Sequence, residues 1–319
     1  MEISLLDRSR VRAGESDGQA LAHTIARAEH ADQLGYHRFW VAEHHAVPGI
    51  ASGAPAVLLA AIGQATSRIR LGSGGVMLPQ HQPIVVAEQF RMLAAMVGDR
   101  VDLGVGASLG FTGAVRQALR RTEITPEEID AEITELLAYL RDEAPVTARP
   151  RTGPIPVHVL ASGSGIARAA RLGLPVVIGG PIVVDPRLPA MLDDYRRSFH
   201  GERPHVMLSV DVFAASTADR ARELALPEAW AMAMSRRTGE FGPLEPVEQI
   251  LAQSWPARVR DRIDKHLDGV VLGAEREVAD RLNSLVAVTG ANELLVSTST
   301  YDVDARAELD ETLIRLMRD

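Results

Sequence analysis

Short runs of β-branched and other apolar residues alternate along the chain with longer stretches in which apolar positions recur at helical spacing. Eight such runs predict β-strands, over residues 3–7, 39–43, 69–74, 101–106, 157–161, 176–179, 206–212 and 294–298. This alternation is typical of βα units and of a parallel sheet. Eight strands are the number that closes a TIM (β/α)8 barrel, so the pattern predicts an α/β fold of that class.

The stretches between the runs carry helix start and stop signals. Residues 17–35 have apolar positions at helical spacing and end at a glycine, and a second predicted helix opens at Pro83 and closes at Gly98. Thr125 precedes a proline and two glutamates, which combine a capping side chain with acids at the positive end of the helix dipole. Further helices are predicted over 163–172, 188–199, 217–226 and 305–317.

The regular spacing breaks once. About 80 residues separate Val212 from Leu294, where one βα crossover needs roughly a dozen. The segment holds Trp230 and Trp255 and has no compositional bias, so we expect a lid or a substrate wall rather than disorder, with a mobile stretch over residues 236–242. The sequence thus predicts one barrel domain over residues 1–319 with an insertion at about 215–290.

An open doubly wound sheet is the main alternative fold. Its dinucleotide-binding glycines would follow the first strand, but residues 7–10 read DRSR. Gly104, Gly106 and Gly110 approximate that fingerprint with one spacing too long. The barrel is therefore favoured.

Composition and charge exclude several classes of function. The 319 residues include no cysteine, which excludes disulfides, thiolate zinc sites and cysteine nucleophiles. The formal net charge is −8 and no basic stripe is present, so we expect no nucleic-acid partner. No run of 18 apolar residues and no apolar core of a secretion signal occur, so we expect no membrane span and a cytoplasmic location.

The second predicted strand ends in three ionisable side chains, Glu43, His44 and His45. In a barrel, catalytic groups come from the C-terminal ends of strands, and a buried strand should end this way only beside a polar cavity or water. The alternative is that Glu43 and His45 hydrogen-bond a neighbouring loop while His44 is solvated. Adjacent strand residues point to opposite faces, so the two histidines are poorly placed to share one metal ion, and we expect no metal site.

Residues with little or no side chain follow the third strand. Ser73, Gly74 and Gly75 would let a planar ligand approach the backbone closely, and Gly106 is a similar small residue at the end of the fourth strand. A β-bulge that fits the curvature of the barrel explains the first three equally well.

A third candidate, Ser162-Gly163-Ser164, lies directly before a predicted helix. Exposed N–H groups at a helix start, together with two hydroxyls, form an anion site suited to a phosphate. A plain N-cap would need only one serine. The run is not a nucleophile elbow, because no glycine lies two positions before either serine. His81, by contrast, is interpreted as part of a polar loop ahead of a helix.

Together these motifs resemble the bacterial luciferase-like family of flavin-dependent oxidoreductases. The similarity covers most of the first 110 residues and resumes at 157–175; its segments include residues 34–36, 39–45, 48–53, 68–72, 78–79 and 87–89. The chain is most similar in kind to the single-chain luciferase-like monooxygenases of actinomycetes, some of which tailor polyketide natural products and so belong to antibiotic biosynthesis.

The resemblance implies roles for the candidate residues. His44 would be the active-site histidine, supported by Glu43 and His45, and Asp7 would lie at the pocket floor. The flavin ring would lie against the third strand, where such proteins commonly hold a cis peptide that here corresponds to Gly74-Gly75. The flavin phosphate would bind to the loop formed by Ser162, Gly163 and Ser164. The resemblance also implies a homodimer through the second and third helices. Residues 56–62 form an apolar stretch, which either a dimer interface or a buried barrel helix would explain.

The chain departs from the family in one place. Luciferases and many relatives carry an arginine just after strand four that helps to hold the phosphate, and this chain has Ala107 there. Losing that guanidinium removes a bidentate, charge-assisted contact. Either phosphate binding is weaker, or an arginine from elsewhere substitutes.

Three functions follow as hypotheses. The first is a monooxygenase that takes reduced FMN from a separate flavin reductase and uses O2 to transfer one oxygen atom to an organic, aromatic polyketide-like substrate, by hydroxylation or epoxidation, with Baeyer–Villiger insertion also open. His44 would move a proton, because the ordinary pKa of histidine lies near neutrality. The second is an F420-dependent oxidoreductase that transfers hydride, and the third is a non-catalytic flavin-binding protein.

Overall fold

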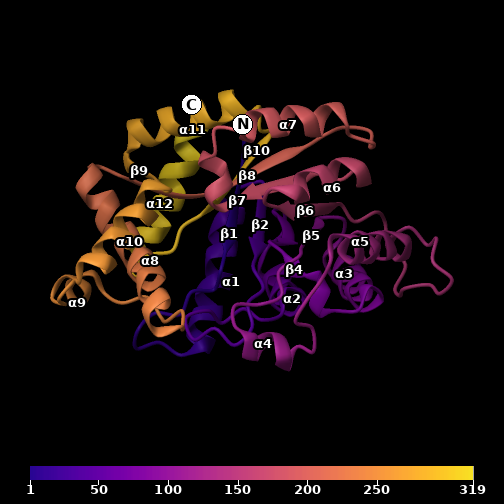
Figure 1. The fold of residues 1–319 in the computed structure, drawn as a ribbon, viewed down its shortest axis with the longest axis horizontal. Helices are drawn as coiled ribbons and strands as arrows, with labels where there is room; N and C mark the ends of the chain where they lie inside the picture. The colour runs from indigo at the N-terminus through magenta and orange to yellow at the C-terminus, as the bar shows by residue number, and fades with distance from the viewer. Residues whose placement is uncertain (319) are drawn as a thin grey trace.

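The computed structural model describes residues 1–318, in which eight parallel strands form a closed barrel (Figure 1). The barrel strands are β1 (Glu2–Asp7), β2 (Arg38–Val41), β3 (Arg70–Ser73), β5 (Val101–Gly106), β6 (Val157–Ala161), β7 (Val176–Gly179), β8 (Val206–Ala215) and β10 (Glu293–Ser297). Strand β10 pairs with both β8 and β1, which closes the ring. The predicted α/β TIM barrel is confirmed.

Helices surround the barrel and return the chain from one strand to the next. They are α1 (Asp17–Leu34), α2 (Pro55–Ala65), α3 (Pro83–Val97), α4 (Gly113–Ala118), α5 (Pro126–Leu140), α6 (Ser164–Leu172), α7 (Leu188–Arg197), α8 (Ala218–Thr238), α9 (Val247–Leu251), α10 (Ala257–Asp268), α11 (Glu275–Thr289) and α12 (Val303–Leu316). Two short 3₁₀ helices follow strands: η1 (Leu78–Gln80) follows the short strand β4 (Val76–Met77), and η2 (Gly180–Val184) follows β7. Thr125 caps α5 in a capping box with Glu128, as its sequence predicts.

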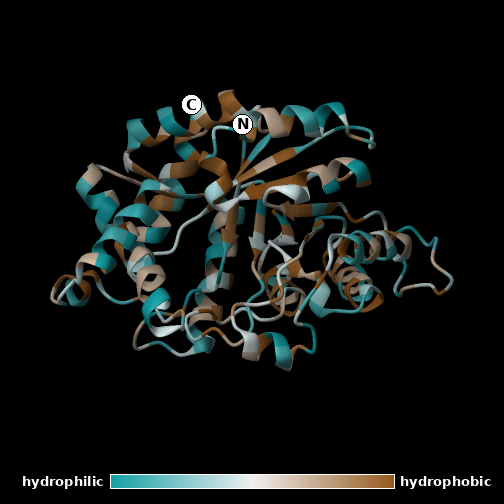
Figure 2. Ribbon diagram, viewed as in Figure 1, coloured by the Kyte–Doolittle hydropathy of each residue, from teal (hydrophilic) through white to brown (hydrophobic). Residues whose placement is uncertain are grey.

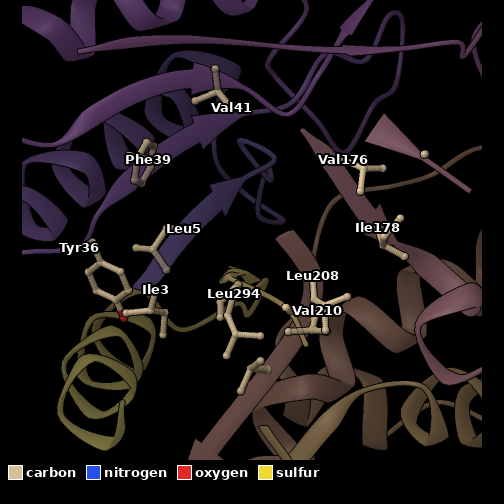
Figure 3. Close-up of a cluster of buried hydrophobic side chains, with 14 of the residues drawn as sticks. Ile3, Leu5, Tyr36, Phe39, Val41, Val176, Ile178, Leu208, Val210 and Leu294 are labelled. Carbon is tan, nitrogen blue, oxygen red and sulfur yellow. The ribbon is translucent and has the colours of Figure 1, made fainter. Parts of the chain in front are cut away.

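The core has two layers, one on each face of the strands. Outward-facing residues pack against the helices, and Figure 3 shows Tyr36 beside the C-terminal helix α12, where its hydroxyl donates to the Asp310 carbonyl at 2.6 Å. Inward-facing residues fill the barrel with a smaller apolar plug, which includes Leu6, Trp40, Val177, Met207 and Leu295. The strands are accordingly hydrophobic, whereas the helices carry much of the hydrophilic surface (Figure 2).

Below the plug, a buried ion network closes the N-terminal end of the barrel. Arg38 contacts Asp102 at 2.6 Å and Glu293 at 3.0 Å, and both carboxylates are fully buried. The polar layer at the base and the apolar plug above it leave only the opposite end, where the strands terminate, for a ligand site.

The element boundaries differ from the predictions in several places. Strand β2 ends at Val41, so Glu43 lies in the following loop, and two short strands were not predicted: β4 (Val76–Met77) and β9 (Val271–Ala274). Helix α8 continues through Pro227 to Thr238, because the buried positions on both sides of the proline keep it packed against the barrel.

The segment between β8 and β10 is built from α8 to α11 and β9, and β9 pairs with the part of β8 that extends beyond the barrel. In Figure 1, α8, α9 and α10 lie together on one flank of the barrel, away from α3 and α5. Across residues 1–318, no helix combines the length and the apolar character that a lipid bilayer crossing requires.

Candidate active site

A cavity of about 690 Å³ opens at the C-terminal ends of the barrel strands. Its floor is the apolar plug, represented by Leu6, Leu160, Val177 and Leu295. The walls come from the loops after β2, β3, β5 and β6. Most of the predicted site residues lie in these walls: Glu43, His44, His45, Gly74, Gly75, Gly106, Ser162 and Ser164.

Glu43 is the anchor of one wall. It is only 3% exposed, and its Oε1 accepts hydrogen bonds from Nε2 of His45 at 2.6 Å and from Nε2 of His81 at 2.7 Å, while Oε2 accepts from the Met77 N–H at 2.8 Å. Burial alone would raise the pKa of Glu43, but these hydrogen bonds outweigh burial and lower the pKa to about 2. Glu43 is therefore ionised at neutral pH.

His81 was interpreted from the sequence as a loop residue, and the structure instead places it on Glu43. The signal that could have suggested this is its position directly after β4 and η1, at the barrel mouth. Glu43, His45 and His81 place one ligand atom each within 4.8 Å of one another. Both imidazoles contact the same carboxylate oxygen at hydrogen-bonding distance. Hydrogen bonds therefore explain why these three side chains lie together.

His44 has a different environment from its two neighbours. Its ring stacks on Phe111, with centroids 5.5 Å apart, and its Nδ1 is buried without a hydrogen-bond partner in residues 1–318. Burial, followed by the charges of Arg8 and Arg10, lowers its pKa to about 4. The expected near-neutral pKa is thus corrected: the lowered pKa leaves His44 uncharged at neutral pH.

A stack of two phenylalanines continues from the His44 ring. Phe111, in the loop after β5, stacks on Phe241, which lies in the loop after α8, with centroids 6.4 Å apart. The guanidinium of the buried Arg10 lies 4.2 Å from the centre of the Phe241 ring. The predicted mobile stretch, residues 236–242, therefore includes a residue that packs on the loop after β5.

The small residues after β3 form a flat part of the wall. The peptide bond between Gly74 and Gly75 is cis, as the family resemblance implies. A Cβ on Gly75 would lie 2.8 Å from the Gly104 carbonyl oxygen, so neighbouring backbone leaves no room for a side chain. Ser73 does not line the cavity: it is fully buried, and its hydroxyl donates to the Gly104 carbonyl at 2.8 Å. The prediction that Ser73 contacts the cofactor is therefore corrected to a supporting position between strands.

The opposite end of the cavity is formed by the start of α6. Ser162 and Ser164 line it with exposed hydroxyls, and no side chain caps this helix. Gly163 adopts φ 63°, a conformation that favours glycine, and it shapes the turn without lining the cavity. The N–H groups of Ser164 and Gly165 make no hydrogen bond within residues 1–318. This end suits an anionic group.

Asp7 is not part of the cavity floor. It points outward to α1, where Oδ2 lies 3.0 Å from Nη1 of Arg27 and Oδ1 accepts from the Ser9 N–H and the Thr24 hydroxyl. Burial opposes ionisation, but Arg27 and Arg306 lower the pKa of Asp7 to about 2. Its position at a strand end suggested a site residue, but strand alternation turns it away from the cavity that Leu6 lines.

A second cavity, of about 1370 Å³, adjoins the first at Ser209, which lines both. It lies between η2 and helices α8, α10 and α11, and its walls include apolar residues such as Val183, Met232 and Leu285. Arg8 and Asp211, 3.3 Å apart, lie at its inner end. The segment between β8 and β10 therefore forms one side of a chamber next to the barrel mouth.

Known proteins with this architecture identify the class. The sequence profile of the luciferase-like monooxygenases matches residues 1–293. A luciferase-like monooxygenase of Escherichia coli strain K12 is 34% identical over 314 residues, covering 95% of this chain and 93% of that protein. An N-acetyl-S-alkylcysteine monooxygenase of Bacillus subtilis strain 168 is 33% identical over 315 residues, covering 93% and 92%. The crystal structure of apo-MsnO8 is 32% identical and covers 99% of this chain and 98% of its own, with a TM-score of 0.89.

The chain belongs to the luciferase-like monooxygenase family, which is a family of flavin-dependent enzymes. Two more distant structures share the fold alone. One is the oxygenating constituent of 3,6-diketocamphane monooxygenase of Pseudomonas putida in complex with FMN, 17% identical with a TM-score of 0.74 and covering 99% and 97% of the two chains. The other is an F420-dependent secondary alcohol dehydrogenase, 16% identical with a TM-score of 0.73 and covering 100% and 99%. Proteins with this fold thus include one in complex with FMN and one that depends on F420.

Proposed function

We propose that this enzyme uses reduced FMN and O2 to transfer one oxygen atom to an organic substrate. The observation that carries the proposal is that a single cavity is lined at once by His44, by the flat Gly74-Gly75 backbone and by the Ser162 and Ser164 hydroxyls. These features match a flat ring with an anionic tail. When bound, FMN would supply the redox chemistry with oxygen, while the protein supplies orientation and shielding.

Each wall has a task in this proposal. The start of α6 holds the phosphate, the Gly74-Gly75 backbone supports the ring, and the uncharged imidazole of His44, which lines the cavity, is available as a hydrogen-bond or proton acceptor at neutral pH. Glu43 keeps its loop in place through His45 and His81. Phe111 and Phe241 limit the access of water, which such chemistry requires.

The choice of cofactor separates the proposal from its alternative, hydride transfer with F420. A short nucleotide tail fits a cavity that ends at α6, so we expect tighter binding of FMN than of F420. The test is to titrate the protein with each cofactor, oxidised and reduced, and to run turnover with FMN, NADH and a flavin reductase under ¹⁸O2. Incorporation of one labelled oxygen atom into product supports the proposal, whereas tight F420 binding with no incorporation of label contradicts it.

For the substrate, we propose an aromatic, polyketide-like molecule that is hydroxylated or epoxidised. The Phe111 ring, which lines the first cavity, and the adjoining apolar chamber support a large, flat substrate. A substrate panel should pair such compounds with N-acetyl-S-alkylcysteines, because one relative is named for that substrate. Turnover of the thioethers alone would contradict the polyketide assignment and leave the monooxygenase proposal intact.

We further propose a transient flavin reductase partner and a homodimer that forms through α2 and α3. Reduced FMN must be supplied from outside, because the two cavities are accounted for by cofactor and substrate. The support for the dimer is the exposure of Val57 on α2 and of Val85, Met92 and Met96 on α3. Within the apolar stretch 56–62, by contrast, Leu58, Leu59 and Ile62 are buried against the barrel. Most of that stretch therefore belongs to the hydrophobic core.

A further inference from the structure

Arg168 lies where the cavity meets α6, and it was not singled out from the sequence. It is one helical turn after Ser164, so the two side chains share a face of the helix. Helical side chains tilt toward the N-terminus, which brings the guanidinium back to the start of α6. There Arg168 lines the cavity together with Ser162, Ser164 and Gly165, although it is only 8% exposed.

The guanidinium of Arg168 is fixed on one edge and free on the other. Its Nε donates to the Asp130 carboxylate, and its Nη2 lies 3.4 Å from the Pro126 carbonyl oxygen, so both contacts are with α5. Its Nη1 makes no hydrogen bond within residues 1–318 and lies 3.8 Å from the position that a Cβ on Gly165 would occupy. The free edge therefore faces the first turn of α6, at the cavity.

The surroundings of Arg168 leave a net positive charge. Asp130 also binds Arg171, at 2.6 Å, so two guanidinium groups share one carboxylate. The free N–H groups of Ser164 and Gly165 add the partial positive charge of a helix start. Hydroxyl, amide and guanidinium donors thus converge on one end of the cavity, and this combination is typical of a phosphate site.

We propose that Arg168 is the cationic contact of the flavin phosphate, through Nη1, and that Asp130 positions it. This inference rests on the proposed use of FMN. It gives the chain a guanidinium for the phosphate even though Ala107, which lines the same cavity, offers only a methyl group. The contact makes the enzyme select FMN over riboflavin, which has the same ring and lacks the phosphate.

The test is to measure the dissociation constants of FMN and riboflavin for the full chain, for example by quenching of flavin fluorescence. Arg168→Ala should weaken FMN binding roughly 10- to 100-fold and change riboflavin binding by less than about threefold. Arg168→Lys should fall between the wild type and the alanine variant for FMN, because lysine keeps the charge and loses the planar fork. Arg171→Ala is the matched control: it shares Asp130, is exposed and does not line the cavity, so both affinities should stay unchanged.

The outcomes separate the inference from the proposed function. If the wild type binds FMN more tightly than riboflavin but Arg168→Ala weakens both ligands equally, or neither, then Arg168 only braces α6 against α5 and the inference is overturned. If the wild type binds no FMN, the proposed function itself fails. Circular dichroism and thermal melting check that the variants fold, and Arg168→Lys carries the test if the alanine variant does not.

Discussion

At the scale of single residues, the Glu43 carboxylate joins three parts of the active-site wall. It accepts from His45 in its own loop, from Met77 in β4 and from His81 at the end of η1. A buried carboxylate is costly unless its oxygens are satisfied, and here both oxygens have partners. The position of each imidazole therefore depends on the charge of Glu43.

Replacing Glu43 by glutamine keeps the shape and removes the charge. The charge-assisted hydrogen bonds to His45, His81 and Met77 then become neutral ones, so we expect Glu43→Gln to lower the free energy of unfolding by about 2 kcal/mol. The pKa of Glu43 is about 2 in the folded protein against an ordinary 4.5, so this contribution is complete above pH 4.5 and is lost as the pH falls toward 2. Urea unfolding of the variant and of Glu248→Gln, an exposed site on α9, measures the difference. Equal effects at both positions would contradict the prediction.

The buried, uncharged His44 should also make the stability of the protein depend on pH. The cause differs from that at Glu43, because here the folded protein disfavours the charged form. The pKa of His44 is about 4 when folded and 6.5 in an unfolded chain, so the unfolded chain binds the proton more readily between these values. The free energy of unfolding should therefore rise as the pH increases from about 4 to about 6.5, and His44→Asn should flatten that rise. Urea titrations at about pH 5 and about pH 7 measure the slope, with His200→Asn as an exposed control. A slope that His44→Asn leaves at its wild-type value would show that His44 does not carry the effect.

The sequence predicted one part of this site and missed another for physical reasons. Three consecutive ionisable residues at a strand end made Glu43, His44 and His45 candidates, and the family resemblance then implied their active-site roles. His81 and Arg168 are separated from them along the chain. Only the closed barrel brings His81 into contact with Glu43 and places Arg168 at the same cavity. The pKa of His44 depends on burial and on nearby arginines, and a linear pattern contains neither.

At the scale of elements, the segment that follows α8 is fastened to the barrel mouth by its backbone. The Phe241 carbonyl accepts from the Gly49 N–H at 2.8 Å, and Leu244 exchanges hydrogen bonds with Val11 and Ala13, at 2.9 Å and 2.7 Å. Phe241 itself packs with Val47, Ile50 and Ala231. The loops after β1 and β2 therefore hold this segment, and with it the Phe241 ring on which Phe111 stacks.

Removing the Phe241 ring should loosen this segment. We expect Phe241→Ala to speed tryptic cleavage after the exposed Arg236 and Arg237 about three- to tenfold, because cleavage follows local opening. Limited proteolysis followed by mass spectrometry locates and times the cut. Leu251→Ala, which truncates a 60% exposed side chain on α9, should leave the rate unchanged. An unchanged rate in Phe241→Ala would mean that the backbone hydrogen bonds alone hold the segment.

Elements were predicted more reliably in their existence than in their ends. The eight apolar runs correspond to the eight barrel strands, because each run is buried on both faces of a parallel sheet. The end of β2 and the length of α8 depend instead on tertiary contacts: Glu43 leaves the strand to accept from Met77, and Pro227 remains inside a helix whose flanking positions are buried. The two-residue β4 is too short to leave a periodic signal.

At the scale of the whole molecule, the two ends of the barrel differ: one is closed by buried ion pairs, and the other carries the candidate active site. The ion network of Arg38, Asp102 and Glu293 closes the N-terminal end, and the cavity opens at the other. The sequence could predict this polarity, because closure by eight strands fixes which loops share the mouth. It could not predict which outer helix faces are left uncovered, because that depends on how each helix packs.

The uncovered faces of α2 and α3 lead to the last prediction, a homodimer. Helices α2 and α3 pack against each other, and Val85, Met92 and Met96 recur on one face of α3 at spacings of seven and four residues. Single exposed apolar side chains are common, but three on one helix face, including two methionines with exposed fractions of 54% and 53%, are typical of a surface that a partner covers. Light scattering should give twice the 34.4 kDa chain mass for the wild type and the single mass for Met92→Glu, which places a charge in the interface. Val288→Glu, at a 64% exposed site on α11, should stay dimeric, and a wild type of single mass would contradict the proposed dimer.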